Sequence, residues 1–310
     1  MIDPSDIPAP LLIDGGLATE LEAKGFNLAH TLWSARLLQE TPQAIVDAHL
    51  AYLRAGAGCI ISASYQASIP GFQSQGLTHE QAQSLLQLSV TLGKQAIAQF
   101  CKESMSPVTP LLAASIGPYG AFLADGSEYR GDYTLSEQEL VDFHRQRLAL
   151  LVQANPDFLA CETIPCLVEA NALSQLIEQY QAPAWISFSC RNGQQLSSGE
   201  AISDAAKRLK DNPYIFAIGI NCSAPQYISE LLTEIKRHWR GRIVVYPNSG
   251  EHYQADSGSW TGTTEPQDCG LAAGRWLQQG ANIIGGCCRM GPEHIQAMQQ
   301  QLSVTDSSGA

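Results

Sequence analysis

Apolar runs alternate with amphipathic stretches along almost the whole chain. Runs with nearly continuous apolar cores begin at eight positions: Leu11, Cys59, Leu111, Phe158, Ala184, Ile215, Ile243 and Asn282. Such runs are typical of parallel strands that are covered on both faces. The stretches between them, for example residues 41–56, 79–100 and 135–155, repeat apolar residues every three or four positions, as amphipathic helices do. The pattern therefore predicts repeated strand–helix units.

Eight strand–helix units predict the α/β class and a single closed (β/α)8 TIM barrel over residues 1–303. An open, doubly wound parallel sheet is the alternative architecture. The length of 310 residues suits one such barrel, and no interdomain linker interrupts the pattern. We expect the last residues, 304–310 (VTDSSGA), to form a frayed tail.

Composition and charge narrow the classes of function. The net charge is −12, whereas nucleic-acid binding needs clustered lysine and arginine, so we expect no nucleic-acid partner. No apolar run approaches the length of about 18 residues that a membrane span needs. The N-terminus lacks the basic and apolar regions of a secretory signal. The nine cysteines have no disulfide-scaffold spacing, so we expect reduced thiols in a cytoplasmic protein of undetermined oligomeric state.

Polar residues gather at the predicted strand ends. Active sites of (β/α)8 barrels form at the C-terminal ends of the strands. The residues at these ends are Asp14, Tyr65, Glu162, Asn221, Cys222, Asn248, Cys287 and Cys288. None of the six lysines is among them, which argues against a Schiff-base aldolase with a lysine at a strand end.

Two adjacent cysteines follow the last predicted strand in the stretch ANIIGGCCRM. Neighbouring side chains of a regular strand point to opposite faces, so Cys287 and Cys288 can meet one ion only where the strand has ended. Gly285 and Gly286 permit the backbone to curl there. Cys222 ends the sixth strand, and the sixth and eighth strand ends open onto the same mouth. Three thiols with a fourth position left open predict a catalytic site for one Zn²⁺ per chain.

Two other interpretations apply to these cysteines. Most buried cysteines are small apolar residues without chemistry. A vicinal disulfide is the second alternative for the adjacent pair. We interpret the other six cysteines as space-filling: Cys59, Cys101, Cys161, Cys166, Cys190 and Cys269.

A long Gly- and Tyr-rich connection, PYGAFLADGSEYRGDY at residues 118–133, follows the third predicted strand. Such a connection lies on the active-site side of a barrel, where long loops serve as lids. Tyr119, Tyr129 and Arg130 are its candidates for closing over a ligand. A surface excursion without a role is the alternative.

At the level of motifs, the sequence resembles the homocysteine S-methyltransferase family. GINC, GGCCR and an early DGG carry the resemblance. ASYQAS, SIGPYG, LADGSEYRGDY, ACETIP and VVYPNSGEHY narrow it to the bacterial and plant branch that uses S-methylmethionine or S-adenosylmethionine. The similarity extends from about Leu11 to the helix after Met290.

The resemblance implies a (β/α)8 barrel that transfers a methyl group from a sulfonium donor to the thiol of homocysteine, forming methionine. It also implies zinc ligation by Cys222, Cys287 and Cys288. Several other positions then belong to the homocysteine site. Glu162 corresponds to the acidic residue that holds the amino group, the Asp14–Gly15 pair lies near the same amino acid, and Tyr65 matches a tyrosine beside the metal in a betaine-using relative. The chain carries no cobalamin- or folate-binding extension, which favours a small sulfonium donor.

Three thiolate ligands suit alkyl transfer on chemical grounds. They leave a Zn²⁺ centre at formal charge −1, and a substrate thiolate makes it −2, so the sulfur stays nucleophilic and attracts a cationic sulfonium. Water-activating zinc sites more often use neutral histidines. The departing thioether is neutral, so we expect no catalytic acid or base. Asn221 and Asn248 then orient the substrate carboxylate or donate to the thiolates, or are ordinary turn residues.

Two other classes of function remain open from the residues alone. One is a barrel lyase or isomerase that binds a phosphorylated substrate through the Gly-rich strand ends. The other is a non-catalytic protein that stores zinc or senses oxidation through its thiols. The sequence also leaves open which sulfonium donor is used, and whether the acceptor is homocysteine or a selenocysteine-type compound.

Overall fold

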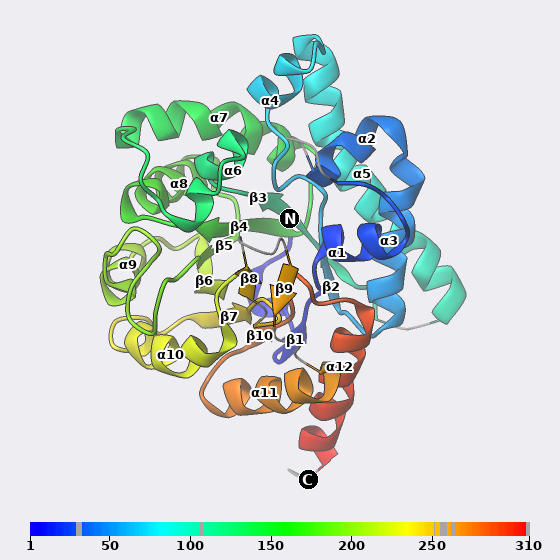
Figure 1. The fold of residues 1–310 in the computed structure, drawn as a ribbon, viewed down its shortest axis with the longest axis vertical. Coiled ribbons are helices and arrows are strands. Elements are labelled where there is room, and N and C mark those ends of the chain that lie inside the picture. Colours follow the sequence, from blue (N-terminus) through cyan, green and yellow to red (C-terminus); the bar gives the residue numbers. More distant parts are fainter. Residues whose placement is uncertain (29–32, 106–107, 251, 255–258, 262–264, 308–310) are drawn as a thin grey trace.

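The apolar runs form one parallel eight-stranded sheet (Figure 1). Its strands are β1 (Leu11–Leu12), β2 (Cys59–Ile61), β3 (Leu111–Ile116), β4 (Phe158–Ile164), β5 (Ala184–Phe188), β6 (Ile215–Asn221), β7 (Arg242–Tyr246) and β10 (Ile283–Ile284). They are ordered β1-β10-β7-β6-β5-β4-β3-β2. A parallel bridge between Ile13 and Cys59 brings the two edge strands together, so the sheet is a nearly closed barrel. The predicted (β/α)8 barrel is confirmed, and the open-sheet alternative is wrong.

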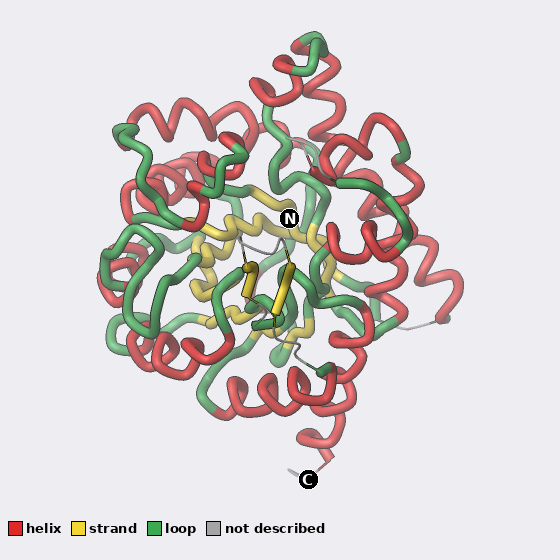
Figure 2. The backbone as a smooth tube through the Cα atoms, viewed as in Figure 1, coloured by secondary structure: helices red, strands yellow, loops and turns green. Residues whose placement is uncertain are grey.

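The structure is a computed structural model that describes the chain except for residues 29–32, 106–107, 251, 255–258, 262–264 and 308–310. Helices surround the strands on the outside (Figure 2). They are α1 (Leu17–Ala23), α2 (Leu37–Glu40), α3 (Pro42–Arg54), α4 (Ile69–Ser74), α5 (His79–Ser104), α6 (Tyr119–Leu123), α7 (Glu137–Gln153), α8 (Leu167–Tyr180), α9 (Ile202–Leu209), α10 (Ile228–Lys236), α11 (Pro266–Gln278) and α12 (Pro292–Ser307). In the described part of the chain, no helix has the length and apolar character needed to cross a membrane.

Local sequence explains where the long helices begin. Thr78 Oγ1 accepts a hydrogen bond from the backbone N–H of Gln81, and the Thr78 N–H donates to the Gln81 side chain. Ser136 and Glu139 repeat this capping box. Both boxes satisfy N–H groups that a helix start leaves without partners. At the other end of the chain, α12 extends to Ser307, past the predicted start of the tail at residue 304.

The barrel interior is apolar at the end where the strands begin. Phe158 and Trp185 pack there, and Ile7 from the N-terminal segment joins the same cluster. The backbone N–H of Ile2 donates to the carbonyl of Asp157, directly before β4, at 3.0 Å. The N-terminal segment therefore covers the N-terminal end of the barrel, which leaves the C-terminal strand ends for a site.

The structure adds elements that the hydrophobic pattern does not predict. β8 (His252–Gln254) and β9 (Ser259–Thr261) form an antiparallel pair after β7. The 118–133 connection contains α6 and a 3₁₀ turn, η3 (Ser127–Tyr129), so it is more ordered than the predicted loop. β7 ends at Tyr246, because the next residue, Pro247, has no N–H to continue the ladder.

Candidate metal centre and substrate pocket

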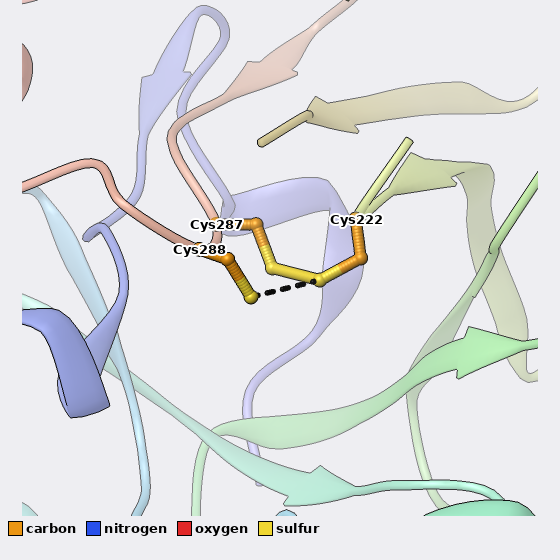
Figure 3. Close-up of side chains that lie close together, drawn as sticks. All are labelled: Cys222, Cys287 and Cys288. Carbon is orange, nitrogen blue, oxygen red and sulfur yellow. Dashed lines mark hydrogen bonds between the residues drawn. A yellow bond between two sulfur atoms is a disulfide. The ribbon is translucent and has the colours of Figure 1, made fainter. Parts of the chain in front are cut away.

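Three cysteines converge where β6 and β10 end (Figure 3). Their sulfur atoms all lie within 4.8 Å of one another, and the Sγ atoms of Cys222 and Cys288 are 3.6 Å apart. Cys222 follows β6 directly, whereas Cys287 and Cys288 follow the glycine pair after β10. The structure thus brings together the three sulfurs that the sequence predicts as metal ligands.

A disulfide joins Cys222 to Cys287 in this structure, and Cys288 is free. The prediction of reduced thiols is therefore wrong at this pair, and the pairing differs from the vicinal alternative. A metal ligand must be a thiolate, so the disulfide and a three-thiolate metal site are alternative states of the same residues. The six cysteines interpreted as space-filling are also free.

Left-handed backbone conformations occur at and next to the converging cysteines. Cys222 and Arg289 have positive φ values of 44° and 65°, in the left-handed region that ordinary residues seldom adopt. Gly285 is needed for a different reason from the predicted curl: a Cβ there would collide with Ile13 and lie 2.8 Å from the Asp14 carbonyl oxygen. The glycine lets the β10 end press against the β1 end, so that the sulfurs meet at the mouth. Left-handed residues clustered at one site are typical of functional positions.

A cavity of about 710 Å³ opens beside the sulfurs, at the C-terminal end of the barrel. Its volume is in the range of small-molecule sites. The predicted residues that line it are Asp14, Gly15, Tyr65, Tyr129, Glu162, Cys222, Asn248, Cys287 and Cys288. Residues in and after α1 also line it, including Glu22 and Phe26.

Two buried carboxylates face this cavity. Asp14 Oδ2 accepts the backbone N–H of Ile61 at 2.8 Å, while the buried Oδ1 has no hydrogen-bond partner among the described residues. Glu162 accepts hydrogen bonds from the hydroxyls of Ser115 and Tyr246. Burial raises the pKa of Glu162 to about 7. Burial, aided by the Glu162 charge, also raises the pKa of Asp14 well above its ordinary value. Such a pair is suited to bind a cation.

Two tyrosines border the candidate metal centre. The Tyr129 hydroxyl is hydrogen-bonded to the side chain of Cys288, and the Tyr65 hydroxyl to that of Thr163. Burial raises the pKa of Cys288, and the hydrogen bond from Tyr129 opposes that shift. Tyr129 therefore links the 118–133 connection directly to a candidate ligand.

Three predicted site residues do not line the cavity: Asn221, Tyr119 and Arg130. Asn221 Oδ1 accepts the Thr163 N–H at 2.7 Å and the Ser187 hydroxyl at 2.9 Å, and its Nδ2 lies 4.0 Å from Cys287 Sγ. Asn221 therefore links β6 to β4 and β5 and points its amide toward Cys287 Sγ, which agrees with the predicted role of a donor to the thiolates. Asn248 does line the cavity, but its side-chain oxygen accepts the Gly250 N–H at 3.0 Å within a turn.

Tyr119 and Arg130 are not brought to the cavity. The Tyr119 ring packs against Phe143, with ring centroids 4.9 Å apart. Arg130 lies on the surface and pairs with Asp132 at 3.0 Å and Asp125 at 3.7 Å. Of the three residues proposed from this connection, the structure places only Tyr129 at the cavity.

Sequence reasoning missed Tyr246 and Thr163, which also line the cavity. The buried Tyr246 hydroxyl bonds with Ser187 Oγ at 2.6 Å and with Trp185 Nε1 at 3.1 Å. Tyr246 stands just before Pro247 at a strand end, and this position could have marked it as a site residue. Thr163 has a φ of 62°, which turns it toward the same side as its neighbour Glu162. Strand alternation does not predict that arrangement.

Comparison with known proteins places this site in a wider context. The family model described as homocysteine S-methyltransferase matches residues 11–302. Homocysteine S-methyltransferase YbgG of Bacillus subtilis is 46% identical over 290 residues, which cover 92% of each chain. Homocysteine S-methyltransferase 1 of Arabidopsis thaliana is 44% identical over 307 residues, which cover 94% of this chain and 93% of the relative. The metallated crystal structure of the homocysteine methyltransferase MmuM from Escherichia coli has a TM-score of 0.87 and 42% identity, and the match covers 96% of this chain and 98% of that one.

Proposed function

The chain belongs to the homocysteine S-methyltransferase family, and from this membership we propose a zinc-dependent transfer of a methyl group from a sulfonium donor to homocysteine. S-Methylmethionine and S-adenosylmethionine are the candidate donors, and methionine is the product. The observation that carries the proposal is the meeting of three cysteine sulfurs at the mouth of an acidic cavity.

The three cysteines fit a zinc ion. Cys222, Cys287 and Cys288 would hold it once the Cys222–Cys287 bond is reduced, and soft thiolates are ligands that zinc prefers. When bound, the ion supplies the positive charge that keeps the homocysteine thiol deprotonated near neutral pH. The Asn221 amide, which points toward Cys287, would orient that ligand. Because these ligands need reduced cysteines, we also propose a cytoplasmic location.

Asp14 and Glu162 would bind the amino group of homocysteine. In the described part of the chain neither carboxylate pairs with a basic side chain, and Asp14 Oδ1 lacks any partner. A substrate ammonium supplies both the positive charge and the hydrogen-bond donors that these buried oxygens lack. It would also favour the ionised form of Glu162, whose pKa burial raises to about 7.

The donor side depends on charge and position rather than on proton transfer. The carboxylates and thiolates around the cavity attract a cationic sulfonium, and the thioether that leaves is neutral. The chain then has to hold the two sulfurs and the methyl carbon in line and exclude water. Tyr129, which lines the cavity and contacts Cys288, is the residue of the 118–133 connection that we place beside the donor.

Family membership argues against the two alternatives that the residues left open, which were a phosphate-binding lyase or isomerase and a non-catalytic metal-binding protein. The buried carboxylates of the cavity also disfavour a phosphorylated substrate, because like charges repel. The test is a side-by-side assay of methionine formation from homocysteine with each sulfonium donor, together with elemental analysis of the protein. Methyl transfer by metal-loaded protein supports the proposal, and its absence with both donors contradicts it.

A further inference from the structure

The carboxylate of Glu169 contacts both ends of the 118–133 connection. Glu169 on α8 is fully buried. Its Oε1 accepts the backbone N–H of Tyr119 at 2.6 Å, and its Oε2 accepts the hydroxyl of Tyr133. Tyr119 begins α6, whereas Tyr133 follows η3. We call residues 117–133 the clamped segment, because this single side chain holds its first and last parts.

A buried network fixes the direction of Glu169. His144 Nε2 lies 2.8 Å from Glu169 Oε1, and Arg147 Nη2 lies 2.7 Å from His144 Nδ1. Arginine can only donate, so His144 Nδ1 accepts and its Nε2–H donates to the carboxylate. Burial lowers the pKa of His144, in agreement with this neutral form. Arg147 also donates to the carbonyl of Gly117 at 2.5 Å, so the network reaches the start of the clamped segment again.

Between its two held ends, the clamped segment reaches the cavity. The Glu128 carbonyl accepts the Ser189 hydroxyl at 2.9 Å, which attaches the middle of the segment beside the end of β5. The next residue, Tyr129, lines the cavity and bonds with Cys288. Arg130 then turns outward, with its side chain 48% exposed. A shift of the segment would therefore move Tyr129 away from the candidate ligand.

We propose that Glu169 is a positioning residue that holds the clamped segment over the cavity, so that Tyr129 meets Cys288 and borders the donor. The functional part of this inference rests on the proposed methyl transfer, while the clamp itself does not. Loosening the clamp should weaken the use of the donor, because Tyr129 lies on that side of the site. The homocysteine side, formed by Asp14 and Glu162, should be unaffected.

The first experiment loosens one end of the clamp and measures proteolysis. Tyr133→Phe removes the hydroxyl that binds Glu169 but keeps the ring, which packs against Tyr119 with centroids 5.4 Å apart. Trypsin cleavage after Arg130 should accelerate about tenfold, as expected for the loss of about 1.4 kcal/mol. Tyr214→Phe, at the opposite end of the barrel before β6, is the matched control and should cleave like the wild type. Equal cleavage rates for all three proteins would overturn the clamp.

The second experiment asks whether the clamp acts through Tyr129. Tyr133→Phe should raise the KM for the sulfonium donor several-fold, with the KM for homocysteine and the zinc content unchanged. In a Tyr129→Phe background the same change should have no further effect on the donor KM, because the contact is already lost. Effects that simply add, or a shift confined to the homocysteine KM, would refute the positioning role.

Glu169→Gln tests the carboxylate directly, with Glu178→Gln as an exposed control on the same helix. If folded, the Glu169 variant should exceed Tyr133→Phe in both proteolysis and donor KM. If it fails to fold because Arg147 loses its counter-charge, the Tyr133 variant still decides the question. A wild-type protein that makes no methionine would contradict the proposed function, and the cleavage rates would still test the clamp by themselves.

Discussion

The proposed metal site depends on the sulfur of Cys288. Cys288→Ser replaces a thiolate with a hydroxyl, which is a poor zinc ligand, so zinc content should fall from about one per chain to near zero. Methionine formation should fall to background while the far-UV circular dichroism spectrum stays unchanged. Cys101→Ser, on α5 away from the site, is the control and should keep both metal and activity. Full activity in a verified zinc-free preparation would refute the metal mechanism.

At Glu162, protonation should control substrate binding. Burial raises the pKa of this carboxyl to about 7, so in the ligand-free protein it is protonated below that pH and ionised above it. Only the ionised form binds an ammonium, so the KM for homocysteine should fall as pH rises through about 7. Glu162→Gln should raise this KM at least about tenfold and flatten its pH dependence, with zinc content unchanged. An equal KM in both proteins would remove the anchoring role.

The raised pKa of Glu162 should also make the ligand-free protein less stable as pH rises. A carboxyl whose folded pKa is raised stabilises the fold at pH below its unfolded value, near 4.5, and this contribution is lost as pH rises through about 7. Urea unfolding between pH 5 and pH 8 should therefore show a loss of stability in the wild type that is smaller in Glu162→Gln. A larger loss in the variant would contradict the assigned pKa.

Single residues were predictable where their chemistry is rare at strand ends. Cys222, Cys287 and Cys288 stood out because few chemical roles require three thiols at one mouth. Thr163 could not be predicted, because its orientation depends on a left-handed backbone angle of 62° that no sequence pattern indicates. Tyr119 was misassigned, because its backbone N–H and ring serve the clamp on Glu169 rather than the cavity.

Among the elements, β4, β5 and β6 depend on one shared side chain. Asn221 binds the Thr163 N–H and hydroxyl and the Ser187 hydroxyl, all buried. Asn221→Ala leaves the buried Thr163 N–H without its partner and removes one bond each from the Thr163 and Ser187 hydroxyls, so it should reduce the free energy of unfolding by about 2–3 kcal/mol. Urea denaturation measures the change. Asn171→Ala, on the outer surface of α8, should cost less than about 0.5 kcal/mol, and equal losses in the two variants would contradict this role.

The apolar periodicity predicted which strands and helices exist. It did not predict where they end, because the ends depend on local chemistry. The eight strands and the long helices α3, α5 and α7 lie where the apolar spacing predicts them. β7 ends before Pro247, which has no N–H to donate, and the turn after β10 depends on the close contact of Gly285 with Ile13. α6 and η3 were missed, since their short turns are held by Glu169 and Ser189 from distant parts of the chain. Long-range hydrogen bonds of this kind leave no local pattern.

In the whole molecule, the two ends of the barrel have separate roles. The N-terminal strand ends are filled by apolar side chains and covered by the N-terminal segment, so this end contributes stability. The C-terminal ends hold buried carboxylates, left-handed residues and three converging sulfurs, which carry a cost in stability. A ligand that satisfies these groups should therefore stabilise the whole fold.

Metal binding should be visible in global stability for this reason. Zinc bound only to the folded protein adds about 2.7 kcal/mol when its free concentration is 100 times the Kd. Chelation of reduced protein should thus lower the Tm by a few degrees, with the far-UV spectrum retained below the transition, because the apolar core needs no metal. Cys288→Ser should show no such shift, since it has no site to empty. If chelation removes zinc from the wild type and the Tm does not change, the three cysteines do not hold the ion in the folded state, and the proposed chemistry loses its centre.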